Sequence, residues 1–303
     1  MINLKDITNN LSCDFEIIGS QTVGIGFCSI FEPIDQGISW VRVKDETLMH
    51  LLTNNPVSIV FCHKVERRLI LGLRQTLILV DNPQLAFSRT VSFFSKKEKV
   101  RPEIHPSAII SPRALIGRDV SIGPFVEIGD CEIGDYVIIK SHSKIHSRVT
   151  IGNNVLISEY CNIGGQGFGY IKNEQNQFEN QLHVGSVVIG DNVSIFPFSN
   201  VDRGTLGTTR IGSGTKIDHY CHIGHNTKIG ENNLITPNVT TLGGVLIGDG
   251  CMIGCGTQIR ESIKIGNNVT IGMSSTVTKN IPNGETWLGS PAVEFSIFKS
   301  RAK

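Results

Sequence analysis

The sequence predicts a mainly β protein, a parallel β-solenoid of six-residue repeats that follows a small α/β domain. Three observations lead to this prediction. From Ile104 onward the chain divides into more than twenty six-residue units, an aliphatic residue opens nearly every unit, and residues 1–97 lack this period. A period of six fits neither a helix nor a simple alternating strand. It fits a coil of three short strands and turns that repeats along an axis.

Residues 1–97 predict a separate α/β domain. The apolar runs VSIVFC and TLILVD are typical of buried strands, and DETLMHLL and NPQLAFSRTVSFF are candidate helices. Residues 98–103 overlap the charged stretch SKKEKVRP, which covers residues 95–102. A run of this kind is interpreted as a solvated linker rather than a binding patch.

Residues 104–281 form the predicted solenoid, with units such as IGDYVI, IGNNVL, IGHNTK and IGDGCM. The opening aliphatic residue is expected to point into the prism, together with the small or β-branched residue four positions later. The glycine that often comes second is expected to supply turn conformations that other residues resist. Residues 282–303 leave the repeat and predict a short helix or an extended tail.

Two insertions interrupt the repeat, at residues 164–188 (which include GGQGFGYIKNEQNQFENQLHVG) and at residues 202–210 (DRGTLGTTR). Loops that leave a rigid scaffold often carry binding groups. Phe168 and Tyr170 are therefore candidate substrate contacts. Packing of the longer loop against a neighbouring subunit is the alternative.

Composition excludes several classes of protein. Lysine and arginine number 28 against 27 acidic residues, a formal charge of +1, so no nucleic-acid partner is predicted. The start MINLKDITNN does not resemble a secretory signal. The most apolar run, LILGLRQTLILV, is short and contains Arg74, so no contact within a membrane is expected. Eight cysteines without CxxC pairs favour reduced thiols and a cytoplasmic location.

The stretch DHYCHIGHNTKIG places His219, His222 and His225 three residues apart, which invites a metal site. Ile217 and Ile223 open units, so His219 and His225 are third residues on successive faces and His222 is a sixth residue. All three should point outward, and one chain cannot gather them around an ion. We predict no metal; a carbonic anhydrase of the gamma type, with histidines meeting across subunits, is the alternative.

The repeat resembles that of the hexapeptide-repeat acyltransferases, whose fold is a left-handed parallel β-helix. Members usually form homotrimers with active sites between neighbouring prisms. The order of a small α/β domain, IHPSAII, GFGY, DRG and GHNTKIG resembles the UDP-3-O-acylglucosamine N-acyltransferases over nearly the whole chain. This resemblance implies that His225 is the general base and that the amide of Gly243 is the oxyanion donor. A β-helix that serves only as a scaffold is the alternative.

Counting along the coils agrees with these roles. Residues 18 apart lie on one face of adjacent coils, which places Gly243 next to His225 (225 + 18 = 243). In the other direction, the four extra residues of the shorter insertion place Arg203 on the preceding coil (225 − 18 − 4 = 203). Asp202, Arg203, His225 and Gly243 are therefore expected to share one side of the prism.

Departures from the family are also visible. The family's second histidine corresponds to Ser262, and an asparagine six residues before the base corresponds to His219. The family's uridine pattern, Phe-x-x-Asn-x-x-Tyr, matches residues 40–46, WVRVKDE, without its Asn and Tyr. The ending LGSPAVEF resembles the Gly-x-Pro-Ala ending of CoA-dependent relatives, which implies donor contacts from Gly289, Pro291 and Ala292. Trp287 either stacks on adenine or caps the solenoid.

The expected function is therefore that of an N-acyltransferase. The acyl group, acetyl or a short 3-hydroxyacyl, would pass from a CoA thioester to the amino group of a nucleotide-linked amino deoxysugar of a lipopolysaccharide O-antigen. The alternative is UDP-3-O-(3-hydroxyacyl)glucosamine N-acyltransferase of lipid A synthesis, with an acyl carrier protein as donor. No tightly bound cofactor is expected, because the thioester is a co-substrate.

The chemistry assigns a role to each candidate. No GxSxG motif is present, so the amine attacks directly and His225 accepts its proton. Asp202 would hold His225 or the incoming ammonium, with a salt bridge to Arg203 as the alternative. Arg203, Asn226 and His219 are candidate substrate contacts, although Asn226 could equally be a polar turn residue. Gly243 and Gly244 could likewise form a tight turn.

Overall fold

The computed structural model describes residues 1–65, 67–95 and 102–297. The chain divides into two compact units, Met1–Val100 and Arg101–Lys303. The predicted linker, residues 98–103, lies mostly outside the described residues.

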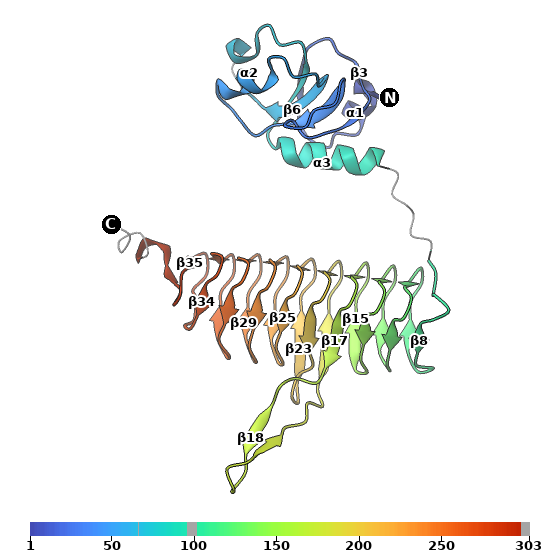
Figure 1. Ribbon diagram of the computed structural model, residues 1–303, viewed down its shortest axis with the longest axis vertical. Coiled ribbons are helices and arrows are strands. Elements are labelled where there is room, and N and C mark those ends of the chain that lie inside the picture. The colour runs from blue at the N-terminus through green and yellow to red at the C-terminus, as the bar shows by residue number, and fades with distance from the viewer. Residues whose placement is uncertain (66, 96–101, 298–303) are drawn as a thin grey trace. The chain divides into compact units, whose positions relative to one another are not determined.

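The N-terminal unit is the predicted small α/β domain (Figure 1). In the described residues its main sheet has the order β2-β7-β6-β5-β4, in which β2 is antiparallel to β7 and the other pairs are parallel. VSIVFC and TLILVD form β6 and β7, whose side chains are nearly all buried. The elements are β1 (Ile2–Asn3), α1 (Leu4–Asn9), β2 (Glu16–Ile18), β3 (Val23–Gly24), β4 (Gly26–Phe27), β5 (Gly37–Trp40), α2 (Thr47–Leu52), β6 (Ile59–His63), a 3-10 turn (Arg67–Ile70), β7 (Thr76–Val80) and α3 (Pro83–Phe94).

The start of α3 follows from its sequence. Asn82 accepts a hydrogen bond from the backbone N–H of Leu85 at 3.1 Å, and Pro83 takes the first helical position, where no N–H is needed. Phe87 of this helix then packs edge-on against Phe61 of β6, with ring centroids 5.9 Å apart. The predicted helix and strand are thus held together by aromatic burial.

The second unit is a left-handed parallel β-helix with three faces, which confirms the predicted fold class (Figure 1). In residues 102–297 the faces are sheets of ten, nine and eight strands. The first face contains β10 (Ser121–Ile122), β13 (Ile138–Ile139), β16 (Leu156–Ile157), β21 (Ser194–Ile195), β24 (Lys216–Ile217), β27 (Leu234–Ile235), β30 (Met252–Ile253), β33 (Thr270–Ile271), β35 (Thr286–Leu288) and β36 (Val293–Glu294). The second contains β8 (Ile109–Ile110), β11 (Glu127–Ile128), β14 (Lys144–Ile145), β17 (Asn162–Gly165), β22 (Asn200–Asp202), β25 (His222–Ile223), β28 (Thr240–Thr241), β31 (Gln258–Ile259) and β34 (Thr276–Val277). The third contains β9 (Leu115–Ile116), β12 (Glu132–Ile133), β15 (Val149–Ile151), β20 (Ser186–Ile189), β23 (Thr208–Ile211), β26 (Lys228–Ile229), β29 (Leu246–Ile247) and β32 (Lys264–Ile265).

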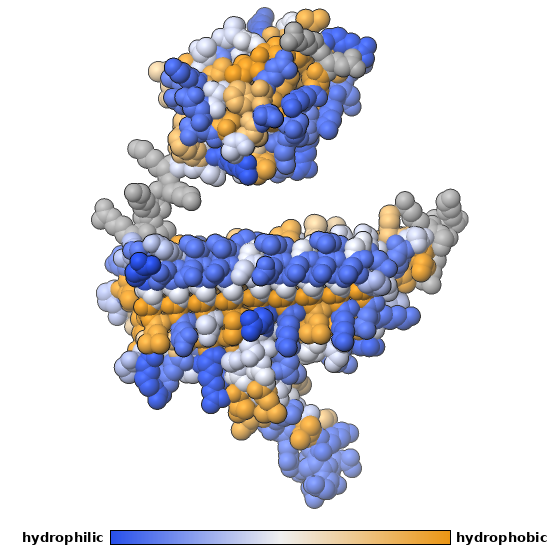
Figure 2. Space-filling view, turned by 180° about the vertical axis from the view of Figure 1, so that it is seen from behind, coloured by the Kyte–Doolittle hydropathy of each residue, from blue (hydrophilic) through white to orange (hydrophobic). Residues whose placement is uncertain are grey.

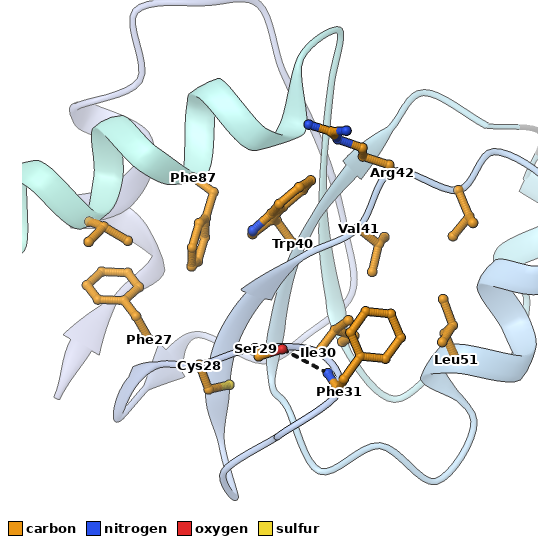
Figure 3. A pocket seen from close by; sticks show the side chains of 12 residues that line it. Phe27, Cys28, Ser29, Ile30, Phe31, Trp40, Val41, Arg42, Leu51 and Phe87 are labelled. Atoms are coloured by element: carbon orange, nitrogen blue, oxygen red, sulfur yellow. Dashed lines mark hydrogen bonds between the residues drawn. The ribbon is translucent and has the colours of Figure 1, made fainter. Parts of the chain in front are cut away.

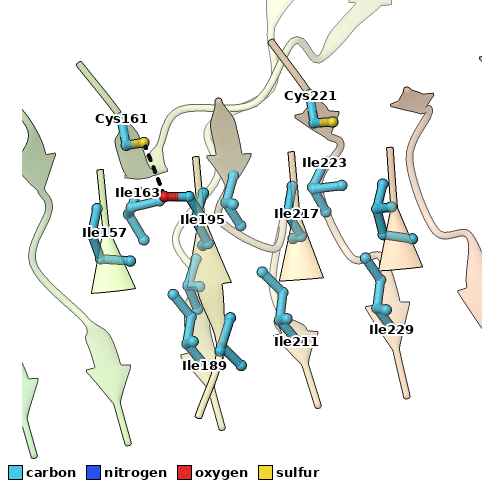
Figure 4. Packing of buried hydrophobic residues seen from close by; sticks show 14 of the residues in the cluster. Ile157, Cys161, Ile163, Ile189, Ile195, Ile211, Ile217, Cys221, Ile223 and Ile229 are labelled. Atoms are coloured by element: carbon cyan, nitrogen blue, oxygen red, sulfur yellow. Dashed lines mark hydrogen bonds between the residues drawn. The ribbon is translucent and has the colours of Figure 1, made fainter. Parts of the chain in front are cut away.

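The core consists of the opening residues of the units, stacked coil upon coil (Figure 4). Ile157, Ile195 and Ile217 are fully buried in line on the first face, and each buried side chain of this size stabilises the fold by about 1.5–3 kcal/mol. The residue four positions later is also buried, as at Cys161 and Cys221. Burial raises the pKa of both thiols to about 11, so they remain neutral packing groups.

The role expected for the second-position glycines is wrong at nearly every position; Gly164, at the start of the longer insertion, is the exception among the described residues, with a φ of 84°. Gly224 does not have a left-handed backbone; a Cβ there would stand 2.7 Å from the carbonyl oxygen of Thr241 on the next coil. In most turns the left-handed residue is the fourth one, as at Asn226, where φ is 60°. Glycine is needed second because neighbouring coils approach closely there, and Asn tolerates the left-handed turn.

Two edges of the prism differ in character. Both insertions leave the prism at the edge between the second and third faces, here called the loop corner. The longer insertion forms a hairpin at its tip, from β18 (Tyr170–Lys172) and β19 (Phe178–Asn180) (Figure 1). The edge between the first and second faces carries stacked rings, with centroids 4.8–5.1 Å apart, from Phe125, His142, Tyr160, Phe198 and Tyr220. Figure 2 shows hydrophobic residues in bands along the solenoid, between rows of hydrophilic ones.

Candidate active site at the loop corner

His225 lies at the loop corner, in the turn between β25 and β26. Its half-buried ring rests on Gly243, which occupies the same turn one coil later. A Cβ on Gly243 would stand 2.4 Å from Cε1 and 2.6 Å from Nε2 of His225. The Nδ1 atom of His225 lies 3.3 Å from the hydroxyl of Thr205. The structure therefore brings His225, Gly243 and the shorter insertion together, in the arrangement that the 18-residue period predicts.

Electrostatics suit His225 to act as a base. Burial is the main cause that lowers the pKa of His225, and the neighbouring His183 and His222 lower it further, while Asp202 opposes them. A lowered pKa keeps the imidazole neutral near pH 7, and only the neutral form can accept a proton. Among the described residues the backbone N–H of Gly243 donates no hydrogen bond, so it is free to meet an oxyanion.

Asp202 lies on β22 and is 5 % exposed. Its carboxylate accepts a 2.6 Å hydrogen bond from Asn200 and lies 3.6 Å from Nε2 of His222. The guanidinium of Arg203 turns to the backbone instead, donating to the carbonyl of Gly164 at 2.7 Å. Asp202 and Arg203, both among the described residues, therefore do not form the alternative salt bridge.

A row of polar side chains along the second face leads to this carboxylate. Asn162 bonds to Nε2 of His146 at 2.8 Å and to Asn200 at 2.7 Å, and Asn200 lies 3.1 Å from Nδ1 of His222. His222 was expected only to point outward, and Asn200 was not among the predicted site residues. The residue spacing contained the signal, because residues 200 and 222 are one coil apart once the four-residue insertion is counted.

Asn226 joins the coil of His225 to the shorter insertion. Its side-chain oxygen accepts from the backbone N–H of Thr205 at 2.8 Å, and its amide group donates to the Thr205 hydroxyl at 3.2 Å. The backbone N–H of Asn226 donates to Thr209 at 2.9 Å. In the structure its side chain thus anchors the loop that carries Asp202.

The structure places His219 on the other edge of the prism from His225, and the aromatic candidates of the longer insertion are exposed. His219 follows β24 on the other edge, 2.6 Å from Asp218, with its ring 5.4 Å from that of Phe196. Phe168 and Tyr170 contact each other at 5.0 Å and are 85 % and 49 % exposed on the longer insertion. In the described residues no three His, Cys, Asp or Glu side chains form a group that could hold a metal ion.

The donor-binding candidates lie at the far end of the solenoid. Gly289 accepts from the N–H of Thr276 at 2.9 Å, and the N–H of Ala292 donates to the carbonyl of Thr276 at 2.8 Å. Pro291 lies between them in the chain, beside β34, which is the strand three coils beyond β25 on the second face. Trp287 packs against the core of the solenoid and donates from Nε1 to Glu285 at 2.7 Å. These contacts favour the capping role for Trp287.

A separate cavity of about 640 Å³ lies in the N-terminal unit (Figure 3). The stretch compared with the uridine pattern contributes Trp40, Val41, Arg42 and Val43 to its wall. The guanidinium of Arg42 lies 5.4 Å from the centre of the Trp40 ring. The site therefore offers a flat aromatic surface beside a cation.

Comparison with known proteins agrees with the architecture. The family model described as "Bacterial transferase hexapeptide (six repeats)" matches residues 130–165, 208–243 and 244–279. The UDP-N-acetylglucosamine acyltransferase structure from Campylobacter jejuni is 32% identical, with a TM-score of 0.58, over 63% of this chain and 73% of that chain. The protein is therefore a hexapeptide-repeat transferase: its prism is built from six-residue units, and a histidine packs on a glycine of the next coil.

The curated relatives narrow the class. The UDP-3-O-acylglucosamine N-acyltransferase of Coxiella burnetii is 32% identical over 262 residues, 76% of this chain and 73% of that protein. The chain belongs to this family of UDP-3-O-acylglucosamine N-acyltransferases. The match to the Pseudomonas syringae pv. tomato relative of the same name, 32% identical over 180 residues, covers 53% of this chain and about half (51%) of that relative. No helix in the described part of the chain is long and apolar enough to cross a bilayer.

Proposed function

We propose that the chain transfers an acyl group from a thioester to the amino group of a nucleotide-linked amino sugar, and that UDP-3-O-acylglucosamine is the acceptor. The proposal rests on the packing of the His225 ring against Gly243, beside the shorter insertion. The contact is so close that a Cβ on Gly243 would stand 2.4 Å from Cε1 of His225. The names of the relatives favour this acceptor over the deoxysugar expected first.

The proposed reaction forms a C–N bond and breaks a C–S bond. The neutral amine attacks the thioester carbonyl, and His225 accepts the proton that the new ammonium loses. The N–H of Gly243 donates to the oxyanion as the carbonyl becomes tetrahedral. Collapse expels the thiolate, which recovers the proton from His225. Asp202 and His222 would bind polar groups of the sugar, because they end the polar row beside the base.

A second acceptor is supported by one observation. Lys44, Asp45 and Glu46, which match the end of the family's uridine pattern, do not line the N-terminal cavity, so the position of the pattern's second ring contributes nothing to its wall. A different nucleotide, such as that of a dTDP- or UDP-linked amino deoxysugar with a CoA donor, would suit such a change.

The two acceptors are separated by assaying defined pairs of substrates. Purified full chain is mixed with UDP-3-O-(3-hydroxyacyl)glucosamine and 3-hydroxyacyl carrier protein, or with UDP- and dTDP-linked amino deoxysugars and acetyl- or 3-hydroxybutyryl-CoA. Products are identified by mass spectrometry, with His225→Ala as the blank. Amide product from the first mixture alone supports the proposal, while product from only the second mixture replaces the acceptor. No product in any mixture refutes the proposed activity.

A further inference from the structure

A second histidine, which is not among the site residues predicted from the sequence, lies against the base. His183 lies in the longer insertion, three residues before β20, and is 3 % exposed. Its ring meets that of His225 edge to face, with centroids 4.7 Å apart and an interplanar angle of 68°. No counting of coils reaches His183, because it lies outside the six-residue period.

The insertion holds this ring from several sides. Nδ1 of His183 lies 3.0 Å from the Gln166 amide nitrogen and 3.0 Å from the carbonyl oxygen of Gln181. The backbone N–H of His183 donates to the side-chain oxygen of Gln166 at 3.3 Å. The next N–H, of Val184, donates to the carbonyl of Thr205 at 2.7 Å, on the loop that also contacts His225. The ring is therefore fixed relative to the base.

Two glycines of the GQGFG stretch make room for the pair of rings. A Cβ on Gly167 would stand 2.9 Å from Nε2 of His183 and 3.1 Å from Cβ of His225. A Cβ on Gly169 would stand 2.6 Å from Cε1 of His183. The motif thus has a physical role, since larger residues would separate the two histidines.

The far nitrogen of His183 has no hydrogen-bond partner. Nε2 is buried and unpaired among the described residues, together with atoms of only Gln75 and Thr76 elsewhere. An unpaired buried polar group reduces stability, and a residue serving only to fill this space would be favoured as an apolar ring. This loss of stability is explained if the His183 imidazole has a role in positioning His225.

We propose that His183 is a positioning residue for the transfer reaction, which fixes the plane of the His225 imidazole and opposes a positive charge on it. This role rests on the proposed function. The charged and titratable groups around His225 are His183 from the insertion, Asp202 from β22 and His222 from β25. His183 contributes to the lowered pKa of His225 after burial, which agrees with the geometry.

The test measures His225 directly, without a substrate. Deuterium exchange at the imidazole C2 position, followed by tandem mass spectrometry, gives a titration midpoint for each histidine of the full chain. We compare wild type with His183→Phe, which keeps a buried ring, and His183→Ala, which does not. His142→Phe is the matched control, because it alters a stacked histidine on the other edge.

Both His183 variants should move the midpoint of His225 up toward the ordinary value, and His142→Phe should leave it unchanged. In the assay described under Proposed function, with the pair of substrates that gives product, kcat of both His183 variants should fall roughly tenfold or more. The KM for the thioester should stay within twofold. An unchanged midpoint in both variants, or an unchanged kcat, overturns the proposal. If neither variant folds, the exchange rate of His183 in wild type decides: slow exchange supports the buried pair, and exchange as fast as His142 refutes it. Failure of the proposed function itself would appear separately, as wild type without product.

Discussion

The imidazole of His225 covers the Cα of Gly243, so that a methyl group on that glycine would lie 2.6 Å from Nε2. Real Cβ contacts are not this short, and the ring would have to move. We therefore expect Gly243→Ala to lower kcat about a hundredfold or more, because a 1 Å displacement of a catalytic group has that effect. Steady-state kinetics of the purified variant measure it.

A matched glycine separates this effect from damage to the solenoid. A Cβ on Gly254 would meet the backbone nitrogen of Met273 at 2.5 Å, on the next coil and away from His225. Gly254→Ala should lower the thermal midpoint of unfolding and leave kcat of the folded protein unchanged. If Gly243→Ala keeps normal turnover, the contact between ring and glycine has no role in catalysis.

Replacement of the base itself should remove most of the activity. His225→Ala is expected to reduce kcat at least a hundredfold, within the roughly 10²–10⁴-fold that general base catalysis contributes. Circular dichroism should be unchanged, because His225 is only half-buried and its turn is held by backbone hydrogen bonds. His142→Ala, on the other edge, is the control with normal kcat. Turnover near that of wild type in His225→Ala would contradict the assignment.

The pH profile should reflect the lowered pKa of His225. Neutral imidazole is the active form, so kcat/KM rises with pH and reaches its plateau above the pKa of His225 in the free enzyme. Since burial lowers that pKa, the acid limb should lie below the ordinary histidine value of about 6.5. Initial rates between pH 4.5 and about 8 would measure the limb. A midpoint above the ordinary value would mean that another group limits the rate.

Asn226 should matter through its loop. Asn226→Ala loses the bonds to Thr205 and places alanine in a left-handed turn at φ 60°, so unfolding should become easier by about 1–3 kcal/mol. Asn226→Gly tolerates the turn but also loses the bonds. Faster amide exchange in residues 203–208 in both variants would identify the anchor. Protection equal to wild type in Asn226→Gly would show that the side chain does not hold the loop.

The N-terminal cavity should bind a nucleotide base against Trp40. The chain has two tryptophans, Trp40 and Trp287, so in a Trp287→Phe background the tryptophan fluorescence comes from Trp40 and reports on the cavity. We expect UMP or dTMP to quench it in a saturable manner, with Arg42 contributing through the phosphate. Arg42→Gln should weaken the binding several-fold. Equal quenching by free ribose 5-phosphate would exclude a stacked base.

The sequence alone was sufficient for the prism and for the pair of His225 and Gly243. Both follow from a strict period, since residues one coil apart must lie side by side whatever their surroundings. The period also placed Asp202 and Arg203 near the base. It could not assign their partners, because Arg203 follows the end of β22 and the direction of its side chain depends on how the insertion packs.

Only the tertiary structure decided what the insertions do. The hairpin of β18 and β19 projects away from the prism (Figure 1), and the segment that returns from it brings His183 against His225, while Asn226 binds the loop after Asp202. These contacts depend on how an aperiodic loop packs, and neither period nor local propensity determines that. The glycines show the same division: their spacing was visible in the sequence, but the close approach of neighbouring coils that requires them is a property of the folded solenoid.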